Sequence, residues 1–190
     1  MRIVAGAHKG RQIAAPKGRT TRPTSDRARE AIFNKLAHAP WSAGLEGRRV
    51  IDLFAGSGAL GFEAMSRGAE FCLFVETDAA ARGAIRENAE ALSMFGNTRI
   101  HRRDATSLGT KPAGVGPVFD LVFLDPPYGK GLGEAALVEL TAGRWVGPDA
   151  LAVFEVGEKE DPQVEGWDRL DEGEYGAARV IFLRPSAVVA

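Results

Sequence analysis

The chain has very few cysteines and no long hydrophobic run. Its 190 residues include one cysteine, Cys72, which excludes an intramolecular disulfide and a cysteine-cluster metal site. Cys72 lies in an apolar run at 71–75, which indicates a buried hydrophobic residue rather than a nucleophile. No stretch approaches the roughly 20 apolar residues that span a membrane, and no signal peptide opens the chain. We therefore expect a cytoplasmic protein without metal or membrane partner, with a monomer as the default state.

Net charge is also close to balance, at -1, so the overall charge by itself indicates no partner. The distribution of charge is uneven, however. Residues 1–49 hold eleven Lys and Arg against three Asp and Glu, whereas residues 150–190 hold nine acidic and four basic residues. A basic N-terminal face predicts a polyanionic partner there.

Short apolar runs alternate with helical segments along most of the chain, and the length fits one domain. The expected strands cover 49–53, 71–76, 97–102, 118–124, 149–156, 164–171 and 177–184. The expected helices cover 58–67, 79–93 and 131–143, with another from Thr24 or Ser25 to about His38. This series predicts an α/β, Rossmann-like fold: a seven-stranded, mostly parallel sheet with helices on both faces. The last two strands would form an antiparallel hairpin with its turn at Gly173 and Gly176.

A glycine-rich loop follows the first of these strands, in the segment 50–61 (VIDLFAGSGALG). Gly56 and Gly58 allow a sharp turn and a close approach of backbone to ligand. The spacing also fits a dinucleotide-binding fingerprint, with Glu76 about twenty residues further on. Asp52 argues against that reading, because a pyrophosphate would meet its negative charge, whereas a cationic ligand would be stabilised there.

Acidic residues lie at or just after the ends of four consecutive expected strands, at Asp52, Glu76, Asp104 and Asp125. Each alone is as well explained by a solvated acid or a helix cap. Because ligands bind outside the carboxyl ends of such strands, four acids at corresponding positions predict one shared site.

The fourth of these acids opens the sequence Asp125-Pro126-Pro127-Tyr128. Two prolines stiffen the turn and leave its carbonyl oxygens free to accept hydrogen bonds. The Asp125 carboxylate and the Pro126 carbonyl could hold both hydrogens of an exocyclic amino group and localise its lone pair. Tyr128 could stack on a nucleobase, an interaction worth about 1–3 kcal/mol. The matching electrophile is the methyl group of S-adenosylmethionine, a sulfonium cation.

Together, DLFAGSG at 52–58 and DPPY at 125–128 resemble the class I S-adenosylmethionine-dependent methyltransferases that act on amino nitrogens. The resemblance implies that Gly56 and Gly58 pass under the methionine moiety, after Phe54, with Asp52 near its charged end. It also implies that Glu76 accepts from the ribose hydroxyls. The adenine amino group would then bond Asp104, with Ala105 near by.

The N-terminal region resembles a more specific family. The segments 2–6 (RIVAG), 9–11 (KGR) and 21–34 (TRPTSDRAREAIFN) are similar to the RsmD family of bacterial 16S rRNA (guanine-N2)-methyltransferases. The similarity continues to the Tyr175-Gly176 turn, and so covers essentially the whole chain. It implies that the partner is 16S rRNA on an assembled or partly assembled 30S subunit.

The charges of the N-terminal region agree with an RNA partner. We expect a basic arm at 1–23 ahead of a single methyltransferase domain at 24–190, with phosphate contacts made mainly from the arm. The residues expected to bind RNA are Arg2, Lys9, Arg11, Arg19, Arg22, Thr24 and Arg27. A further hypothesis is that 22–24 closes over the cofactor.

Two alternatives stay open at this point. The chain could be another amino-directed methyltransferase, such as a DNA adenine-N6 enzyme, although 190 residues leave little room for a target-recognition region. It could also be a non-catalytic RNA-binding or ribosome-assembly protein on the same fold.

Overall fold

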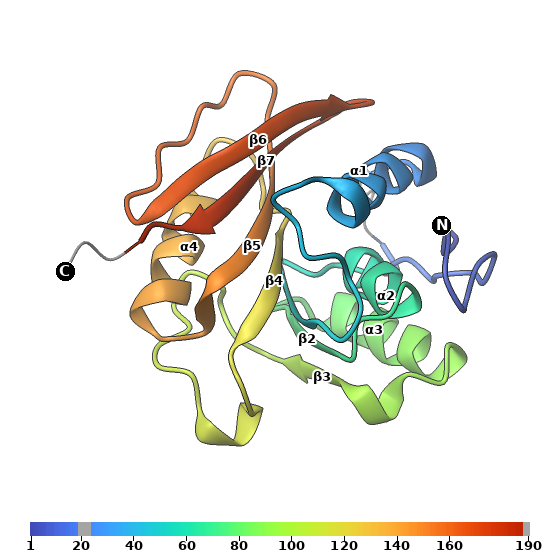
Figure 1. Ribbon diagram of the computed structural model, residues 1–190. Helices are drawn as coiled ribbons and strands as arrows, with labels where there is room; N and C mark the ends of the chain where they lie inside the picture. The colour runs from blue at the N-terminus through green and yellow to red at the C-terminus, as the bar shows by residue number, and fades with distance from the viewer. Residues whose placement is uncertain (19–23, 188–190) are drawn as a thin grey trace.

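A seven-stranded sheet runs through the protein in the computed structural model, which describes residues 1–18 and 24–187. The strands lie in the order β3-β2-β1-β4-β5-β7-β6 (Figure 1). Neighbours from β3 to β5 pair in parallel, whereas β7 pairs antiparallel with both β5 and β6. The strands are β1 Arg49–Leu53, β2 Phe71–Val75, β3 Thr98–His101, β4 Phe119–Leu124, β5 Val146–Val156, β6 Trp167–Tyr175 and β7 Ala178–Pro185. The helices are α1 Asp26–His38, α2 Ala59–Ser66, α3 Ala79–Ala91 and α4 Leu132–Ala142, with short 3-10 turns at Phe95–Asn97 and Ala113–Val115.

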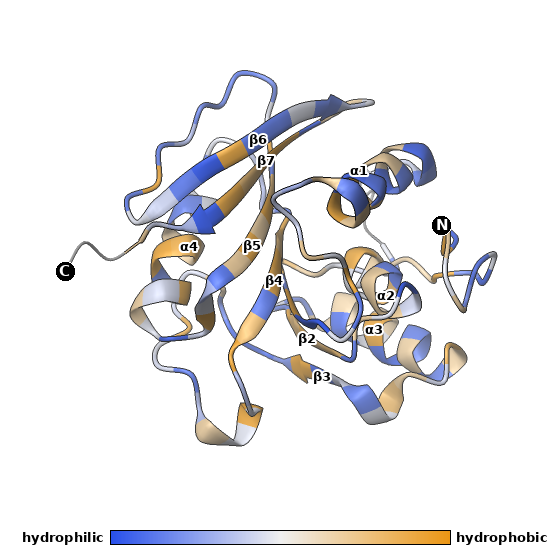
Figure 2. Ribbon diagram, viewed as in Figure 1, coloured by the Kyte–Doolittle hydropathy of each residue, from blue (hydrophilic) through white to orange (hydrophobic). Residues whose placement is uncertain are grey.

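Helices cover both faces of the sheet, because the side chains of each strand alternate between the faces. In β4, Leu121 and Phe123 pack into one apolar core with α1, α2 and α3. Val122 and Leu124 pack into a second core with α4 on the opposite face. Figure 2 shows the hydrophobic residues gathered in the central strands, whereas the edge strand β6 is largely hydrophilic. Charged residues on an edge strand protect it from pairing with another chain.

The predicted α/β fold is confirmed: the sheet has seven strands, is mostly parallel and ends in an antiparallel hairpin. The differences lie mainly in that C-terminal hairpin. The prediction that Gly173 belongs to the turn is wrong, because Gly173 pairs with Val180 inside β6. The turn is formed around Gly176, whose φ of 67° is accessible to glycine at little cost. The solvent-facing side of β6 has few apolar residues, so the sequence pattern marks its ends poorly.

The N-terminal segment 1–18 packs against the body of the protein. Arg2 and Gln12 form an isolated antiparallel bridge, and Ile3 and Ile13 are buried in the core that contains α2 and α3. The side-chain amide of Asn88 on α3 bonds both backbone polar groups of Ala14. Residues 19–23, the rest of the expected arm, lie outside the described part of the chain.

Within residues 1–18 and 24–187, none of the helices has the length and apolar character needed to cross a membrane.

Candidate active site

A cavity of about 730 Å³ opens where the strand order changes direction, beside the carboxyl ends of β1 and β4. This is the position at which open α/β sheets bind ligands. The cavity is lined by most of the residues that the sequence predicts for the site: Asp52, Phe54, Gly56, Glu76, Asp104, Ala105, Asp125, Pro126, Pro127 and Tyr128. Side chains separated by more than 70 positions in the chain are thereby brought to one place.

The glycine-rich loop shapes the floor of this cavity. Phe54 has a φ of 58°, which is uncommon for a residue with a side chain and marks local backbone strain. Gly56 has the same φ, and the space beside its Cα is open, so a ligand can approach its backbone. Gly58 lies behind the loop, where an added Cβ would come within 2.7 Å of Phe62 and 2.9 Å of Phe74. Gly58 therefore packs against the core, and it is not among the residues that line the cavity.

Asp52 connects the end of β1 to the start of α2. Its carboxylate accepts a hydrogen bond from the N–H of Gly61 at 3.0 Å. The N–H groups of the first helical turn have no partner within the helix, and the N-cap residue, Gly58, has no side chain that could accept from them. The Asp52 carboxylate supplies that acceptor for Gly61. Burial raises the pKa of Asp52 well above its ordinary value; the Gly61 bond partly offsets this, and the Asp125 and Glu76 carboxylates add to it. A cation placed in the cavity would relieve that repulsion.

Glu76 fastens the glycine-rich loop to the end of β2. Its carboxylate accepts from the N–H of Gly56 and from the N–H of Asp78, both at 2.8 Å. Asp78 itself caps α3, accepting from the N–H of Ala81 at 2.8 Å.

Asp104 follows β3, the strand at one edge of the sheet, and lines the cavity together with the DPPY turn that follows β4. Its Oδ1 accepts from both the hydroxyl and the N–H of Thr106, and these bonds lower the pKa of Asp104. Asp104 thus stays an ionised acceptor. Ala105, which is buried, follows it.

Asp125 and Tyr128 face a carboxylate that the sequence reasoning missed, Glu155 on β5. The Tyr128 hydroxyl donates to Glu155 Oε1 at 2.7 Å, and the Thr24 hydroxyl donates to Glu155 Oε2 at 3.0 Å. Burial, followed by the charge and hydrogen bond of Glu155, raises the pKa of Asp125 to about 7. A sequence signal did exist, because Glu155 is the acid near the end of the fifth strand and continues the series of strand-end acids.

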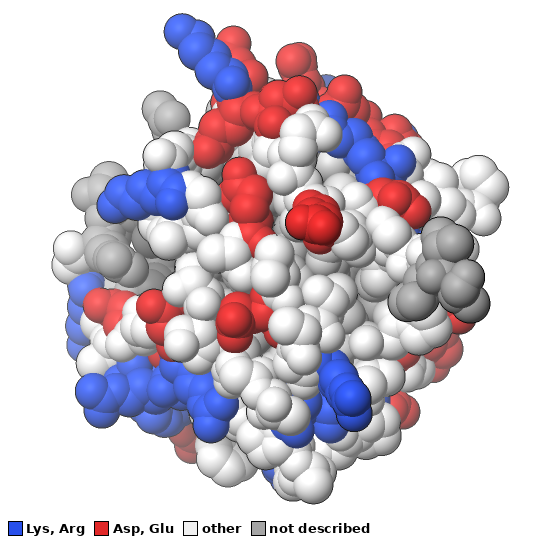
Figure 3. Space-filling model, turned by 90° about the vertical axis from the view of Figure 1, so that its left-hand side faces the viewer, with Lys and Arg blue, Asp and Glu red and all other residues white. Residues whose placement is uncertain are grey.

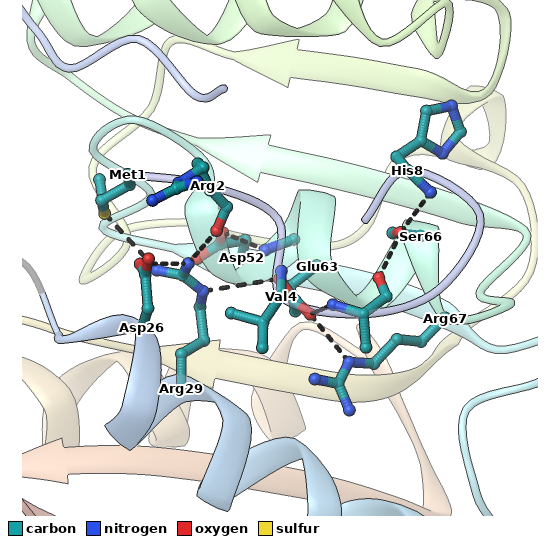
Figure 4. A network of polar contacts seen from close by, with 12 residues as sticks. Met1, Arg2, Val4, His8, Asp26, Arg29, Asp52, Glu63, Ser66 and Arg67 are labelled. Atoms are coloured by element: carbon teal, nitrogen blue, oxygen red, sulfur yellow. Dashed lines mark hydrogen bonds and ion pairs between the residues drawn. The ribbon is translucent and has the colours of Figure 1, made fainter. Parts of the chain in front are cut away.

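A buried ion network lies behind the cavity (Figure 4). Arg29 of α1 is 1% exposed and lines the cavity, and Glu63 of α2 is 0% exposed. Arg29 pairs with Asp26 at 2.9 Å and lies 3.6 Å from Glu63, while also donating to the Arg2 carbonyl. Glu63 in turn accepts from Arg67 Nε and from the N–H groups of residues 4 and 5. The network joins the N-terminal segment and α1 to the helix that follows the glycine-rich loop.

The residues expected to bind RNA divide by position. The side chains of Arg2, Lys9 and Arg11 are exposed on the N-terminal segment, and Arg11 donates to the Ala91 carbonyl. Arg27 is exposed on α1. Thr24 instead lines the cavity through its bond to Glu155, and Arg19 and Arg22 lie outside the described residues.

Charge is also divided over the surface that Figure 3 shows. Acidic side chains gather over its upper part, where Figure 1 places the β6–β7 hairpin, and basic side chains gather along its lower part. Strand β6 carries four acids and one Arg, whereas 99–103 (RIHRR) carries three Arg. Arg103 from this second segment lines the cavity. This basic segment is not among the residues that the sequence predicts to bind RNA.

Comparisons with known proteins agree with this geometry. A family model described as "Conserved hypothetical protein 95" matches residues 1–184. Ribosomal RNA small subunit methyltransferase D from Haemophilus influenzae is 35% identical over 179 residues, which cover 93% of this chain and 89% of that protein. The solved structure of yhhF from Escherichia coli has a TM-score of 0.82 and 34% identity, and covers 98% of both chains.

A more distant solved structure supports the fold alone. Magnesium protoporphyrin IX methyltransferase from Synechocystis PCC 6803, solved with bound SAM, has a TM-score of 0.60 and 16% identity over 83% of this chain and 78% of that chain. The family resemblance read from the sequence is confirmed by the closer relatives. This chain therefore has the class I methyltransferase fold and belongs to the RsmD family, that of ribosomal RNA small subunit methyltransferase D.

Proposed function

We propose that this chain transfers a methyl group from S-adenosylmethionine to the exocyclic N2 amino group of a guanine in 16S rRNA. The substrate would be an assembled or partly assembled 30S particle. The relatives named ribosomal RNA small subunit methyltransferase D support the RNA substrate. The observation that supports the chemistry is the position of Asp125 to Tyr128 on the wall of the cavity at the carboxyl ends of β1 and β4.

The cavity fits the proposed cofactor. Its volume of about 730 Å³ is in the range of small-molecule sites, with several polar groups converging on it. The open space beside Gly56 allows a ligand to reach the backbone, and the buried Asp52 favours a positive charge near by. We assign Asp52, Phe54, Gly56 and Gly58 to the methionine end, with Gly58 acting by shaping the loop. Glu76 would accept from the ribose, and Asp104 with Ala105 would bind the adenine.

When bound, the cofactor supplies an electrophilic methyl group on a positively charged sulfur. The Asp125 carboxylate and the Pro126 carbonyl would accept the two N2 hydrogens and localise the nitrogen lone pair toward that methyl group. Pro127 keeps the turn stiff, and Tyr128 would stack on the base. Asp125 would take the proton that the methylated nitrogen releases, a role that its pKa of about 7 fits. Catalysis is then largely positioning.

The RNA would lie across the basic N-terminal segment and α1. The exposed side chains of Arg2, Lys9, Arg11 and Arg27 suit phosphate contacts. Arg19, Arg22 and Thr24 remain expected contacts, with Thr24 close enough to the cavity to meet the target nucleotide itself. A guanine in a loop is already partly unstacked, which lowers the cost of extruding it into the cavity.

The test is a transfer assay with labelled S-adenosylmethionine and three substrates: naked 16S rRNA, unmethylated 30S particles and duplex DNA. Label should appear in 16S rRNA, and digestion to nucleosides should yield N2-methylguanosine. The Asp125→Ala variant is the control for transfer by this site. Label in DNA, in N6-methyladenosine, or in no substrate would refute the proposal.

A further inference from the structure

A pair of carboxylates, Asp125 and Glu155, stands at the wall of the cavity. The parallel pairing of β4 with β5 sets Leu124 opposite Phe154, so the next residues of the two strands, Asp125 and Glu155, are neighbours. Both line the cavity, and Glu155 is close enough to hydrogen-bond the Asp125 carboxyl. Asp125 is the proposed catalytic acceptor, whereas Glu155 has no role in the reaction described so far.

Placing these two carboxylates side by side costs free energy unless hydrogen-bond donors stabilise their charge. Two adjacent carboxylates repel each other when both are ionised, which is one cause of the raised pKa of Asp125. Tyr128 and Thr24 each donate one hydrogen bond to Glu155, one to each oxygen. A carboxylate has about four acceptor positions, so Glu155 can still accept from a ligand in the cavity. The pair is therefore matched to a ligand that presents two neighbouring N–H donors.

Guanine has this arrangement and the other amino-bearing bases do not. Its N1–H lies next to the N2 amino group on the Watson–Crick edge, so both positions donate. Adenine presents an acceptor at N1 beside its N6 amino group, and cytosine presents an acceptor at N3 beside its N4 amino group. Either acceptor would face a carboxylate, and a site built for a donor rejects such a ligand because its own acceptor is left unpaired.

We propose that Glu155 determines base specificity by accepting the N1–H of the target guanine while Asp125 and Pro126 hold its N2 amino group. This inference rests on the proposed function, and it explains why a DPPY turn, which is compatible with several amino groups, would here select guanine. The bonds from Tyr128 and Thr24 orient the Glu155 carboxylate, and they connect it to the stacking residue and to the start of α1.

The test replaces the target guanine by 2-aminopurine, which keeps the 2-amino group but has an acceptor at N1. The methylated nucleotide is first mapped with the wild-type protein. Ligated 16S rRNA carrying guanine or 2-aminopurine at that position is then assembled into 30S particles, and kcat/KM is measured for each. The wild type should prefer guanine about tenfold to a hundredfold.

Variants assign that preference to a residue. Glu155→Ala and the nearly isosteric Glu155→Gln should both lower the preference at least severalfold, because Gln can donate to an acceptor as well as accept from N1–H. Tyr128→Phe is the matched control: it removes one bond to Glu155 but keeps the carboxylate, so turnover should fall while the preference persists. Because 2-aminopurine also lacks the guanine O6, the comparison is made as a double-mutant cycle, in which any effect of O6 is common to all variants.

The outcomes separate this inference from the proposed function. If Glu155→Gln, shown to be folded by its thermal melt, keeps the full wild-type preference, the N1–H is recognised by another group and the inference is wrong. If the wild type methylates no guanine at all, the proposed function itself fails. If the wild type uses both bases equally, guanine is methylated without recognition of N1–H, which also overturns the inference.

Discussion

The carboxylate of Glu76 accepts a hydrogen bond from the backbone N–H of Gly56 at 2.8 Å, which ties the end of β2 to the glycine-rich loop. The same side chain is the predicted acceptor for the cofactor ribose. Glu76→Ala should therefore weaken S-adenosylmethionine binding about tenfold to a hundredfold, because it removes a charged acceptor and releases the loop. Isothermal titration calorimetry measures this, with Glu87→Ala on the exposed face of α3 as the control. Equal affinity in the Glu76 and Glu87 variants would contradict the assignment.

Asp125→Ala should abolish methyl transfer, with a loss of about a hundredfold or more, because it removes an acceptor that acts on the reacting nitrogen. Cofactor affinity should stay within about twofold of the wild type, since the acceptors assigned to the ribose and adenine are unchanged. Single-turnover kinetics with parallel cofactor titration separate the two effects. Transfer at the wild-type rate would refute the role of Asp125.

The pH dependence of transfer should report the ionisation of Asp125. Only its carboxylate form can both accept the N2–H of the target guanine and take up the released proton, so kcat/KM should rise with pH and reach half its limit near pH 7. Glu155 raises the pKa of Asp125, so Glu155→Gln should move the rising limb of the kcat/KM profile toward lower pH. The other acids that line the cavity, Asp52, Glu76 and Asp104, are unchanged in that variant. A limb that does not move would show that Glu155 does not set it.

Glu63→Ala should destabilise the protein by about 3–5 kcal/mol, because it leaves the buried Arg29 and two backbone N–H groups without their acceptor. Urea unfolding followed by circular dichroism measures the change in the free energy of unfolding. Glu70→Ala, at an exposed position just after α2, is the matched control and should change it by less than about 0.5 kcal/mol. Similar losses in the two variants would argue against the network as a source of stability.

Replacing Lys9 and Arg11 together by Ala should weaken RNA binding and reduce its dependence on salt. Each lost phosphate contact lowers the slope of log K against log salt by about 0.7–0.9. Fluorescence anisotropy with a labelled 16S rRNA fragment at several salt concentrations gives the slope. Lys159→Ala, in the acidic region between β5 and β6, should leave the slope unchanged. A slope that stays the same in the double variant would remove the N-terminal segment from the RNA contact.

Much of the site could be predicted because its parts are local in sequence. A buried strand, an acid and two glycines in 50–61 produce the strand, loop and helix start that the structure shows. The stiff turn at 125–128 likewise follows from its two prolines. The alternation of strands and helices predicts that the acids at the carboxyl ends of β1, β2, β3 and β4 meet at one edge, and the structure brings them to one cavity.

Other features depend on which strands become neighbours. Glu155 lies 27 positions from Tyr128, and the placement of β5 beside β4 brings these two together. Thr24, 131 positions from Glu155, reaches it from the segment that precedes α1. Gly58 fits the ligand-binding motif, yet the structure places it against Phe62 and Phe74. The charge pair of Arg29 and Glu63 connects α1 to α2. The sequence pattern of each helix predicts that helix but does not predict that the two helices are in contact.

By itself the sequence determined the fold class, the glycine-rich loop and the stiff proline turn at 125–128, because local backbone preferences and hydrophobic periodicity encode each of them. Only the tertiary structure decided which carboxylate stands beside Asp125 and how the N-terminal segment is held against α2. Those contacts join residues far apart in the chain, and their energies depend on burial and on neighbouring charges that exist only once the sheet has assembled.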